Sequence, residues 1–251
     1  MSGLLTADEK QQYRDQGYCG PFRLCSSQEM YEIKSKIRDD VLSKPGPLVD
    51  IPRSERHVDS RIVYDLCSHQ AITERATELL GENIVLWWSS FFDKPPGPKT
   101  ATPLHNDTHH FPIEPFVNLT AWIALDKVTA ENGAMQVVPY SHKCNYPTLP
   151  SFSRIGSYKN LDFDVVIDPS YVEPTDLVTI ELEAGEFYFF SERMVHGSLA
   201  NLSSSNRLGL AVRMTIPMVK VYHDLRYEGH GVLLLKGQDQ MHLNHVINPP
   251  T

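Results

Sequence analysis

Apolar positions at helical spacing run through the first eighty residues and predict helices there. Thr6 and Glu9 have the spacing of a capping box, in which each side chain bonds the backbone of the other at a helix start. Ser27 is predicted to cap a second helix, whose apolar residues recur every three or four positions. That apolar face consists of Met30, Ile33, Ile37 and Val41, after which Pro45, Pro47 and Pro52 interrupt the pattern.

A third helix is predicted to end at about Leu80. Ile72, Ala76 and Leu79 fall on one face of it, which we expect to point inward. Gly81 then stands where a left-handed residue commonly ends a helix.

After Gly81 the pattern changes to short runs of β-branched and aromatic residues, which predict strands. Gly, Pro and Asn separate these runs, as in the PPGP turn at Pro95–Pro98. Many short strands favour a barrel or sandwich over alternating strands and helices, and neither G-x-G-x-x-G nor a Walker pattern occurs. The predicted strands are 84–92, 117–125, 134–138, 177–182, 187–190 and 208–216.

The segment from Tyr140 to about Thr175 does not follow this pattern of short predicted strands. It has weak periodicity and several Ser, Pro and Tyr residues. Because a long loop inside a compact domain is usually functional or disordered, we interpret this segment as a lid.

Composition narrows the class of protein without defining it. A chain of 251 residues with 41% hydrophobic and 22% charged residues is typical of a globular protein. The net charge of −8 and the lack of a basic run disfavour a nucleic-acid or membrane partner. No apolar stretch is long enough to span a bilayer and no secretory signal is recognised, so we expect a cytoplasmic protein. The four scattered cysteines are predicted to be free, partly buried thiols.

Two H-x-D tripeptides are candidate metal-binding motifs: His57-Val58-Asp59 and His105-Asn106-Asp107. With 11 histidines and 31 acidic residues, such a match arises by chance, so the surrounding residues must decide. His57 lies in the charged stretch RSERHVDSR, which we interpret as a solvated polar turn. His105 follows a strand and a Pro/Gly turn and precedes a strand carrying Trp122, which favours a metal site.

A mononuclear iron(II) oxygenase uses two imidazoles and one carboxylate on one face of the metal. The second histidine should follow a later strand, and the run GEFYFF leads into Met194-Val195-His196. Arg207 opens the next strand, where its planar guanidinium suits a carboxylate, although a structural ion pair remains an alternative. Arg213 lies on the same strand face by period-2 counting, and its role stays open.

These segments together resemble the phytanoyl-CoA dioxygenase (PhyH) superfamily of iron- and 2-oxoglutarate-dependent oxygenases. Within it, the chain is most similar to the syringomycin-type aliphatic halogenases. The resemblance covers nearly the whole chain and consists of LTADEKQQYRDQGYCGPF, FFDKPPG, H-N-D, ENGAMQVVPYSH and H-G-S…N-R-L-G-L-A-V-R. The series in this order is specific, whereas any single piece is not.

The resemblance implies a mainly β (α+β) fold, namely a double-stranded β-helix (a cupin-like jelly roll) with flanking N-terminal helices. We expect one Fe(II)/2-oxoglutarate dioxygenase domain over residues 1–251. Its parts are a helical segment at about 1–81, a β-helix core at about 82–220 and a C-terminal tail at 221–251.

The resemblance also implies the site. His105, Asp107 and His196 match the metal ligands, and Arg207 matches the residue that binds the distal carboxylate of 2-oxoglutarate. Thr102 and Trp122 match residues that help hold that carboxylate. The implied cofactors are Fe(II), 2-oxoglutarate as co-substrate, and O₂.

One departure from the halogenases indicates the reaction type. Those enzymes carry Ala or Gly where this chain has Asp107, which opens a metal position for chloride. A carboxylate fills that position, so hydroxylation of an unactivated C–H bond is predicted, with release of succinate and CO₂. The expected substrate is a small metabolite of natural-product biosynthesis (an amino acid, an amine or a related intermediate), free or tethered to a carrier protein.

Several alternatives remain open at this point. The same ligands serve desaturation, epoxidation and cyclisation, and a non-catalytic barrel or a cupin-type metal enzyme without 2-oxoglutarate would share much of the pattern. His109, His110, Phe111 and Tyr140 flank the predicted site mouth, with substrate contact and ordinary packing equally open. The tail Gly231–Thr251 could cover that mouth or join a partner, and His230, His242 and His245 are expected to be structural or surface residues. The oligomeric state is undetermined.

Overall fold

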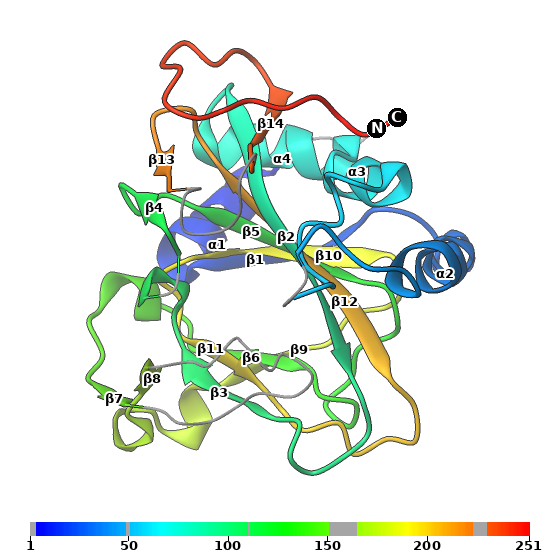
Figure 1. Ribbon diagram of the computed structural model, residues 1–251. Helices are drawn as coiled ribbons and strands as arrows, with labels where there is room; N and C mark the ends of the chain where they lie inside the picture. The colour runs from blue at the N-terminus through cyan, green and yellow to red at the C-terminus, as the bar shows by residue number, and fades with distance from the viewer. Residues whose placement is uncertain (1–3, 49–50, 110, 151–164, 223–229) are drawn as a thin grey trace.

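Two antiparallel sheets face each other, and helices cover the outer side of the larger one (Figure 1). The computed structural model describes residues 4–48, 51–109, 111–150, 165–222 and 230–251. This arrangement is the predicted double-stranded β-helix with flanking helices. None of the helices in the described residues has the length and apolar character needed to cross a bilayer.

The larger sheet contains, among the described residues, six strands in the order β1-β10-β5-β12-β2-β14. These strands are β1 (Tyr18–Arg23), β2 (Ile84–Lys94), β5 (Leu119–Ala124), β10 (Glu186–Ser191), β12 (Arg207–Thr215) and β14 (Leu233–Lys236). The sheet therefore also includes β1, which lies between two helices of the N-terminal segment, and β14, which lies in the C-terminal tail.

The smaller sheet has the order β3-β11-β6-β9 in the described chain, and two short pairs, β13-β4 and β7-β8, flank the core. The strands of the smaller sheet are β3 (Thr102–His105), β6 (Met135–Val137), β9 (Val178–Ile180) and β11 (His196–Ser198). The flanking strands are β4 (Ile113–Glu114), β7 (Thr148–Pro150), β8 (Val165–Ile167) and β13 (Lys220–Val221).

The helices belong mostly to the first eighty residues, as the sequence predicts. They are α1 (Ala7–Gln16), α2 (Ser27–Lys36), its π-helical continuation η1 (Ile37–Leu42), α3 (Arg61–Cys67) and α4 (Gln70–Leu80). Short 3-10 turns occur at η2 (Asp107–His109), η3 (Ser141–Lys143), η4 (Pro169–Tyr171) and η5 (Pro174–Asp176).

The helix ends agree with the sequence in one case and correct it in two. The capping box of Thr6 and Glu9 is present on α1. The cap of α2 is Ser26, paired with Glu29, because Ser27 already has helical backbone as the first residue of the helix. Gly81 has the positive φ (100°) that favours glycine, but its ψ of −178° differs from that of a left-handed helix cap, and the chain leaves α4 directly toward β2.

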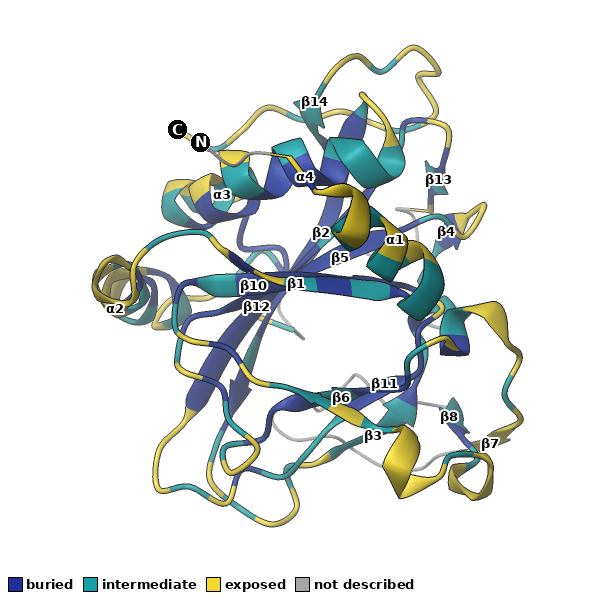
Figure 2. Cartoon of the chain, turned by 180° about the vertical axis from the view of Figure 1, so that it is seen from behind, coloured by how far each residue is buried: buried dark blue, intermediate teal, exposed yellow. Residues whose placement is uncertain are grey.

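Apolar side chains form two layers, one on each side of the larger sheet. Helical residues such as Met30, Ile37 and Ile72 pack against outward-facing strand residues such as Phe189 and Leu210. A second cluster lies between the sheets and includes Trp122, Tyr188, Phe190, Met135 and Ala211. Figure 2 shows the resulting dark band of buried residues along the large sheet. Polar residues on the inward face are therefore exceptions to its apolar packing, and they mark the site.

The predicted lid and the C-terminal tail both contain ordered structure. The segment 140–175 includes η3 and the antiparallel pair of β7 with β8, and residues 151–164 lie outside the described chain. In the tail, β14 pairs with β2, and the side chain of Asn244 bonds the backbone of Val219 and Val221. The tail thus completes the edge of the larger sheet.

The four cysteines are free thiols within the described residues, as predicted.

The first H-x-D motif is not a solvated turn, and that interpretation was wrong. Glu55, Arg56 and His57 are buried, because residues 53–57 run along the open edge of β2 where β14 stops. His57 Nδ1 lies 2.7 Å from Ser89 Oγ, and Glu55 approaches His57 Nδ1 at 3.9 Å and His230 Nδ1 at 3.3 Å. The charged residues of this stretch suggested exposure to solvent, but in the fold they are buried beside polar or oppositely charged partners. Burial lowers the pKa of His57 to about 3, and the charge of His230 contributes.

We predict that acid destabilises the fold through His57. Its pKa is depressed in the folded protein relative to the ordinary 6.5, so the stabilisation is complete above pH 6.5 and is lost as the pH falls toward 3. From pH 7 to 5 this single group should lower the free energy of unfolding by about 2 kcal/mol. Urea unfolding of metal-free protein at the two pH values measures the loss.

His57→Gln should remove that share of the pH dependence. The matched control is His242→Asn, because His242 is exposed and has a positive φ that Asn tolerates. If the variant and the wild type lose equal stability between pH 7 and 5, His57 is not the responsible group.

Candidate metal centre

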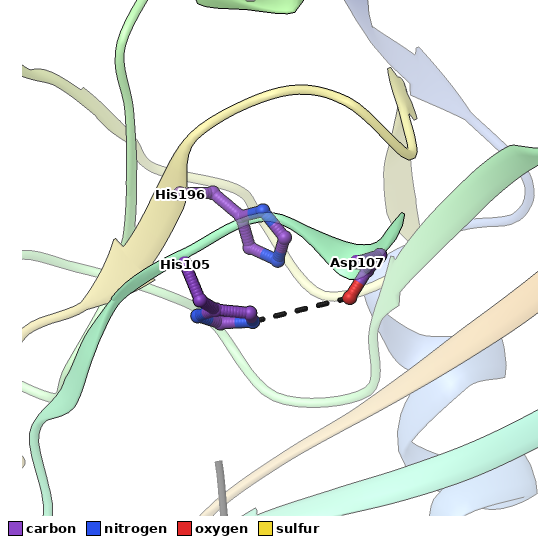
Figure 3. A group of neighbouring side chains, drawn as sticks. All are labelled: His105, Asp107 and His196. Carbon is purple, nitrogen blue, oxygen red and sulfur yellow. Dashed lines mark ion pairs between the residues drawn. The ribbon is translucent and has the colours of Figure 1, made fainter. Parts of the chain in front are cut away.

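The three predicted metal ligands come from two paired strands and the turn that follows one of them. His105 is the last residue of β3, Asp107 begins the turn η2, and His196 begins β11. Strands β3 and β11 are antiparallel, with His196 directly opposite His105. Strand pairing therefore brings together side chains that are far apart along the chain (Figure 3).

The geometry of this group suits one metal ion. One ligand atom from each of the three residues lies within 4.8 Å of the others. Nε2 of His105 is 3.9 Å from Oδ1 of Asp107, and the two imidazole rings have their centres 4.2 Å apart. All three residues are about 5% exposed, so water has little access to the ligand atoms from outside. Among the described residues this is the group of metal-ligating side chains that meets in space.

Backbone carbonyls orient both imidazoles. His105 Nδ1 lies 2.9 Å from the carbonyl oxygen of Pro103, and His196 Nδ1 lies 3.0 Å from that of Met194. A carbonyl oxygen only accepts hydrogen bonds, so each Nδ1 carries the proton and each Nε2 carries the lone pair. Metal-binding histidines typically donate their other ring N–H to a carbonyl or carboxylate in this way, and this is the observation that fits the side chains to a metal.

Asp107 is held from both directions along the backbone. Its amide donates to the carbonyl of Glu192 (2.9 Å), and its own carbonyl accepts from the amide of Phe111 (3.2 Å). The pKa of the Glu192 carboxyl is raised to about 7, mainly by burial and in smaller part by the Asp107 carboxylate. The turn η2 is thereby fixed next to the end of β10.

Arg207 lies buried on the inward face of β12. Its guanidinium donates to the carbonyl of Gly133 (2.8 Å) and stands over the Trp122 ring at 5.1 Å. Gly209 makes this possible, because a Cβ at that position would lie 2.2 Å from the Trp122 ring. The sequence prediction placed Arg207 and Trp122 at one site, and the structure brings them into contact.

Aromatic side chains connect the Arg207 end of the space between the sheets with the metal-ligand group. Phe190 packs on His196 with 4.9 Å between ring centres, Tyr188 stacks on Phe190, and Trp122 follows at 6.4 Å from Tyr188. Thr102 lies at the start of β3, opposite Ser198 of β11. Both strands therefore run from the metal-ligand group toward the Arg207 end.

Lys94 is a residue that sequence analysis missed at this end. It is the last residue of β2 and pairs directly with Arg207. Its Nζ donates to Ser198 Oγ and to the carbonyl of Leu199, each at 2.6 Å. The pKa of Lys94 is lowered to about 7, mainly by burial and in smaller part by the charge of Arg207. Period-2 counting along IVLWWSSFFDK could have placed Lys94 on the inward face, but its pairing with Arg207 follows from tertiary packing and not from any motif in the sequence.

The residues expected around the site mouth divide into packed and exposed ones. Phe111 is half-buried against Trp87, whereas His109 and Tyr140 are exposed. His110 lies outside the described residues. His230 belongs to the buried cluster around Glu55, and His242 and His245 are exposed. None of these three C-terminal histidines joins the metal-ligand group, as predicted.

A double-stranded β-helix that carries two histidines and one carboxylate on a pair of neighbouring strands and the adjoining turn fits the arrangement of mononuclear non-haem iron oxygenases. The chain matches the phytanoyl-CoA dioxygenase (PhyH) family over residues 13–209, which is most of its length. The protein therefore belongs to the PhyH family.

Curated relatives agree with this assignment. The probable phytanoyl-CoA dioxygenase of Caenorhabditis elegans is 24% identical, and the match covers 83% of this chain and 74% of that protein. The peroxisomal phytanoyl-CoA dioxygenase of Homo sapiens is 23% identical, with 84% and 68% covered. That of Arabidopsis thaliana is 32% identical over 70% of this chain and 61% of its own.

Solved structures share the fold. The apo form of the non-heme monooxygenase ThoJ superimposes with a TM-score of 0.81 at 19% identity, covering 97% of this chain and 88% of ThoJ. CytC3, solved with Fe(II) and alpha-ketoglutarate, superimposes with a TM-score of 0.76 at 22% identity, covering 98% and 94%. These likenesses establish the architecture independently of the family match.

We predict that Asp107→Ala lowers the affinity for Co(II), used as an air-stable probe, by about 100-fold, because it removes the carboxylate of the three-ligand group. Calorimetric titration measures the dissociation constant. The matched control is Asp59→Asn in the other H-x-D motif, which keeps an acceptor for the Arg56 guanidinium. Equal Co(II) affinity in Asp107→Ala and the wild type contradicts the ligand assignment.

Proposed function

We propose that this protein is an Fe(II)- and 2-oxoglutarate-dependent dioxygenase that hydroxylates an unactivated C–H bond of a small metabolite. The observation that carries the proposal is the convergence of His105, Asp107 and His196 in a buried group, with Arg207 buried on the inward face of the larger sheet opposite. PhyH family membership and the Fe(II) and alpha-ketoglutarate in the CytC3 structure agree with the predicted cofactors.

Each side chain has a defined part in this proposal. His105 and His196 hold the metal through Nε2, and Asp107 supplies the carboxylate that a chloride would replace in a halogenase. Arg207 binds the distal carboxylate of 2-oxoglutarate, with Thr102 and Trp122 beside it. The bound iron supplies the redox chemistry that couples oxidative decarboxylation of 2-oxoglutarate to C–H oxidation.

The protein itself positions the co-substrate and surrounds it with apolar side chains. The stack of Phe190, Tyr188 and Trp122 excludes water between the metal-ligand group and Arg207. In a low-dielectric space a guanidinium attracts a carboxylate more strongly than it does in water. A keto acid bound at Arg207 is therefore directed toward the three ligands.

The finer parts of the proposal concern substrate and location. We favour an intermediate of natural-product biosynthesis, free or presented on a carrier protein, in the cytoplasm. Two solved structures of similar fold, SnoN and SnoK, are an alpha-ketoglutarate-dependent epimerase and carbocyclase from nogalamycin biosynthesis. The retained carboxylate of Asp107 disfavours halogenation, and hydroxylation is the reaction that we propose for this chain.

Turnover tests the proposal directly. We expect succinate and CO₂ from 2-oxoglutarate, with both products requiring Fe(II) and O₂, when a small-metabolite panel is screened by mass spectrometry. Arg207→Gln should raise the KM for 2-oxoglutarate at least tenfold, because it removes the bidentate partner of a buried carboxylate.

The alternatives predict different results in the same assay. A non-catalytic metal-binding barrel forms no succinate, and a cupin-type enzyme without the co-substrate stays active when 2-oxoglutarate is omitted. A KM unchanged by Arg207→Gln contradicts the proposed co-substrate site.

Lys94 gives a further prediction about co-substrate binding. Because the pKa of Lys94 is about 7, the ammonium is present below pH 7 and is lost above it. An anion bound at the Arg207 end favours the charged form, so the KM for 2-oxoglutarate should rise between pH 6.5 and 8.5.

Lys94→Met should raise that KM several-fold at pH 6.5 and flatten its pH dependence. The matched control is Lys127→Met, because Lys127 is exposed and pairs with Glu183 on the surface. A Lys94→Met profile parallel to the wild type assigns the pH dependence to other groups.

A further inference from the structure

Arg213 occupies the inward face of β12 at the other end from Arg207. Ala211 of the same strand packs in the cluster between the sheets, and Arg213 follows it by two residues. The register stays regular from Arg207 to Arg213, and the bulge opposite β2 comes only between Arg213 and Met214. Side chains at even spacing on a regular strand share a face, so both arginines face inward.

The two arginines are too far apart to bind one co-substrate. Six residues of antiparallel strand span about 20 Å, which is much longer than a five-carbon keto acid. A co-substrate held by Arg207 and the metal therefore does not extend to Arg213.

Arg213 is connected to the metal-ligand group through Phe111. Its guanidinium carbon lies 4.9 Å from the centre of the Phe111 ring. The backbone amide of Phe111 donates to the carbonyl of Asp107 at 3.2 Å, which fixes Phe111 one turn beyond the ligand. The path from the ligands to Arg213 thus begins at Asp107, whereas the path to Arg207 begins at His196 and passes through Phe190. The two cations lie on opposite sides of the metal-ligand group.

The neighbours of Arg213 combine apolar rings with polar groups. The Phe111 ring meets Trp87 edge-on at 5.0 Å, and Arg213 is opposite Trp88 on one neighbouring strand and Thr120 on the other. Thr120 Oγ1 accepts from the side-chain amide of Asn118, and both residues are buried. Aromatic rings offer contact area to an apolar group, and a guanidinium braced on a ring keeps its planar donors in a fixed orientation.

We infer that Arg213 binds an oxyanion of the substrate, a carboxylate or a phosphate, while the aromatic rings beside it contact the adjacent apolar part. This inference rests on the proposed function and names its substrate class. Arg213 sets which molecule is positioned at the metal centre, and Arg207 sets the co-substrate. A chain with a net charge of −8 repels anions in general, so an anionic substrate requires a local cation of this kind.

Matched pairs of small compounds test the inference. One series pairs aliphatic and aromatic carboxylic acids with their primary amides, and a second pairs phosphate monoesters with the parent alcohols. Binding is read as the change in tryptophan fluorescence of the Ni(II)- and 2-oxoglutarate-loaded protein, because Trp87 and Trp88 adjoin Arg213. Succinate release from the Fe(II) enzyme gives an independent readout.

In the wild type, we expect the charged member of a pair to bind at least tenfold more tightly than the neutral member. The series that responds identifies the oxyanion as carboxylate or phosphate. Arg213→Gln should abolish this preference while leaving the KM for 2-oxoglutarate within twofold of wild type. Arg213→Lys keeps the charge without the planar fork and should retain part of the preference. Arg61→Gln, an exposed arginine on α3, is the matched control.

Three outcomes overturn the inference while leaving the proposed function in place. They are equal binding of charged and neutral members by the wild type, response to no charged compound in either series, and undiminished preference in Arg213→Gln. A KM for 2-oxoglutarate raised in Arg213→Gln as much as in Arg207→Gln also overturns it. By contrast, absence of Fe(II)-dependent succinate formation in the wild type overturns the proposed function itself.

Discussion

The antiparallel pairing of β3 with β11 is the constraint on which the candidate site depends. It sets His196 directly opposite His105, and the turn after β3 then delivers Asp107. A slip of one residue in this register would turn His196 to the other face of the sheet and separate the ligands. Gly197 permits the pairing, because a Cβ there would lie 2.7 Å from the carbonyl oxygen of Thr102. The three side chains therefore form one site only because the strand register brings them together.

Strand geometry also fixes the positions of the side chains on the inward face of β12. One strand carries Arg207 and Arg213 at opposite ends of the same face, with Gly209 and Ala211 between them where large side chains would fill the interior. The small residues leave room for the Trp122 ring at the Arg207 end. Both arginines lie on one strand and so keep a fixed distance to the metal-ligand group. If Arg207 and Arg213 bind co-substrate and substrate as we propose, no moving part is needed to align the two molecules.

Much of this arrangement can be predicted from the sequence because it depends on local patterns. The capping box at Thr6, most strands of the larger sheet and the inward position of Arg207 all follow from spacing and residue type. Strands β1 and β3 were not predicted, since β1 contains Gly20 and Pro21 and β3 has only four residues, so neither shows an alternating run. The stretch around His57 was misjudged for another reason: charged residues predict exposure, and only tertiary packing shows that Glu55 lies beside His57 in the interior. Lys94 was not singled out, because its position beside Arg207 is likewise set by tertiary packing.

The placement of β14 has a consequence for how the chain is made. Strand β2 supplies inward residues at both ends of the interior, yet one of its edges is completed by β14, the last strand of the described chain. During synthesis that edge stays open after every metal ligand has left the ribosome. An unpaired strand rich in Trp, Phe and Ile is prone to pair with other chains. Nascent protein therefore passes through an interval in which the candidate metal ligands have been synthesised but the larger sheet still has an open edge that favours aggregation. Pairing of β14 with β2 closes that edge.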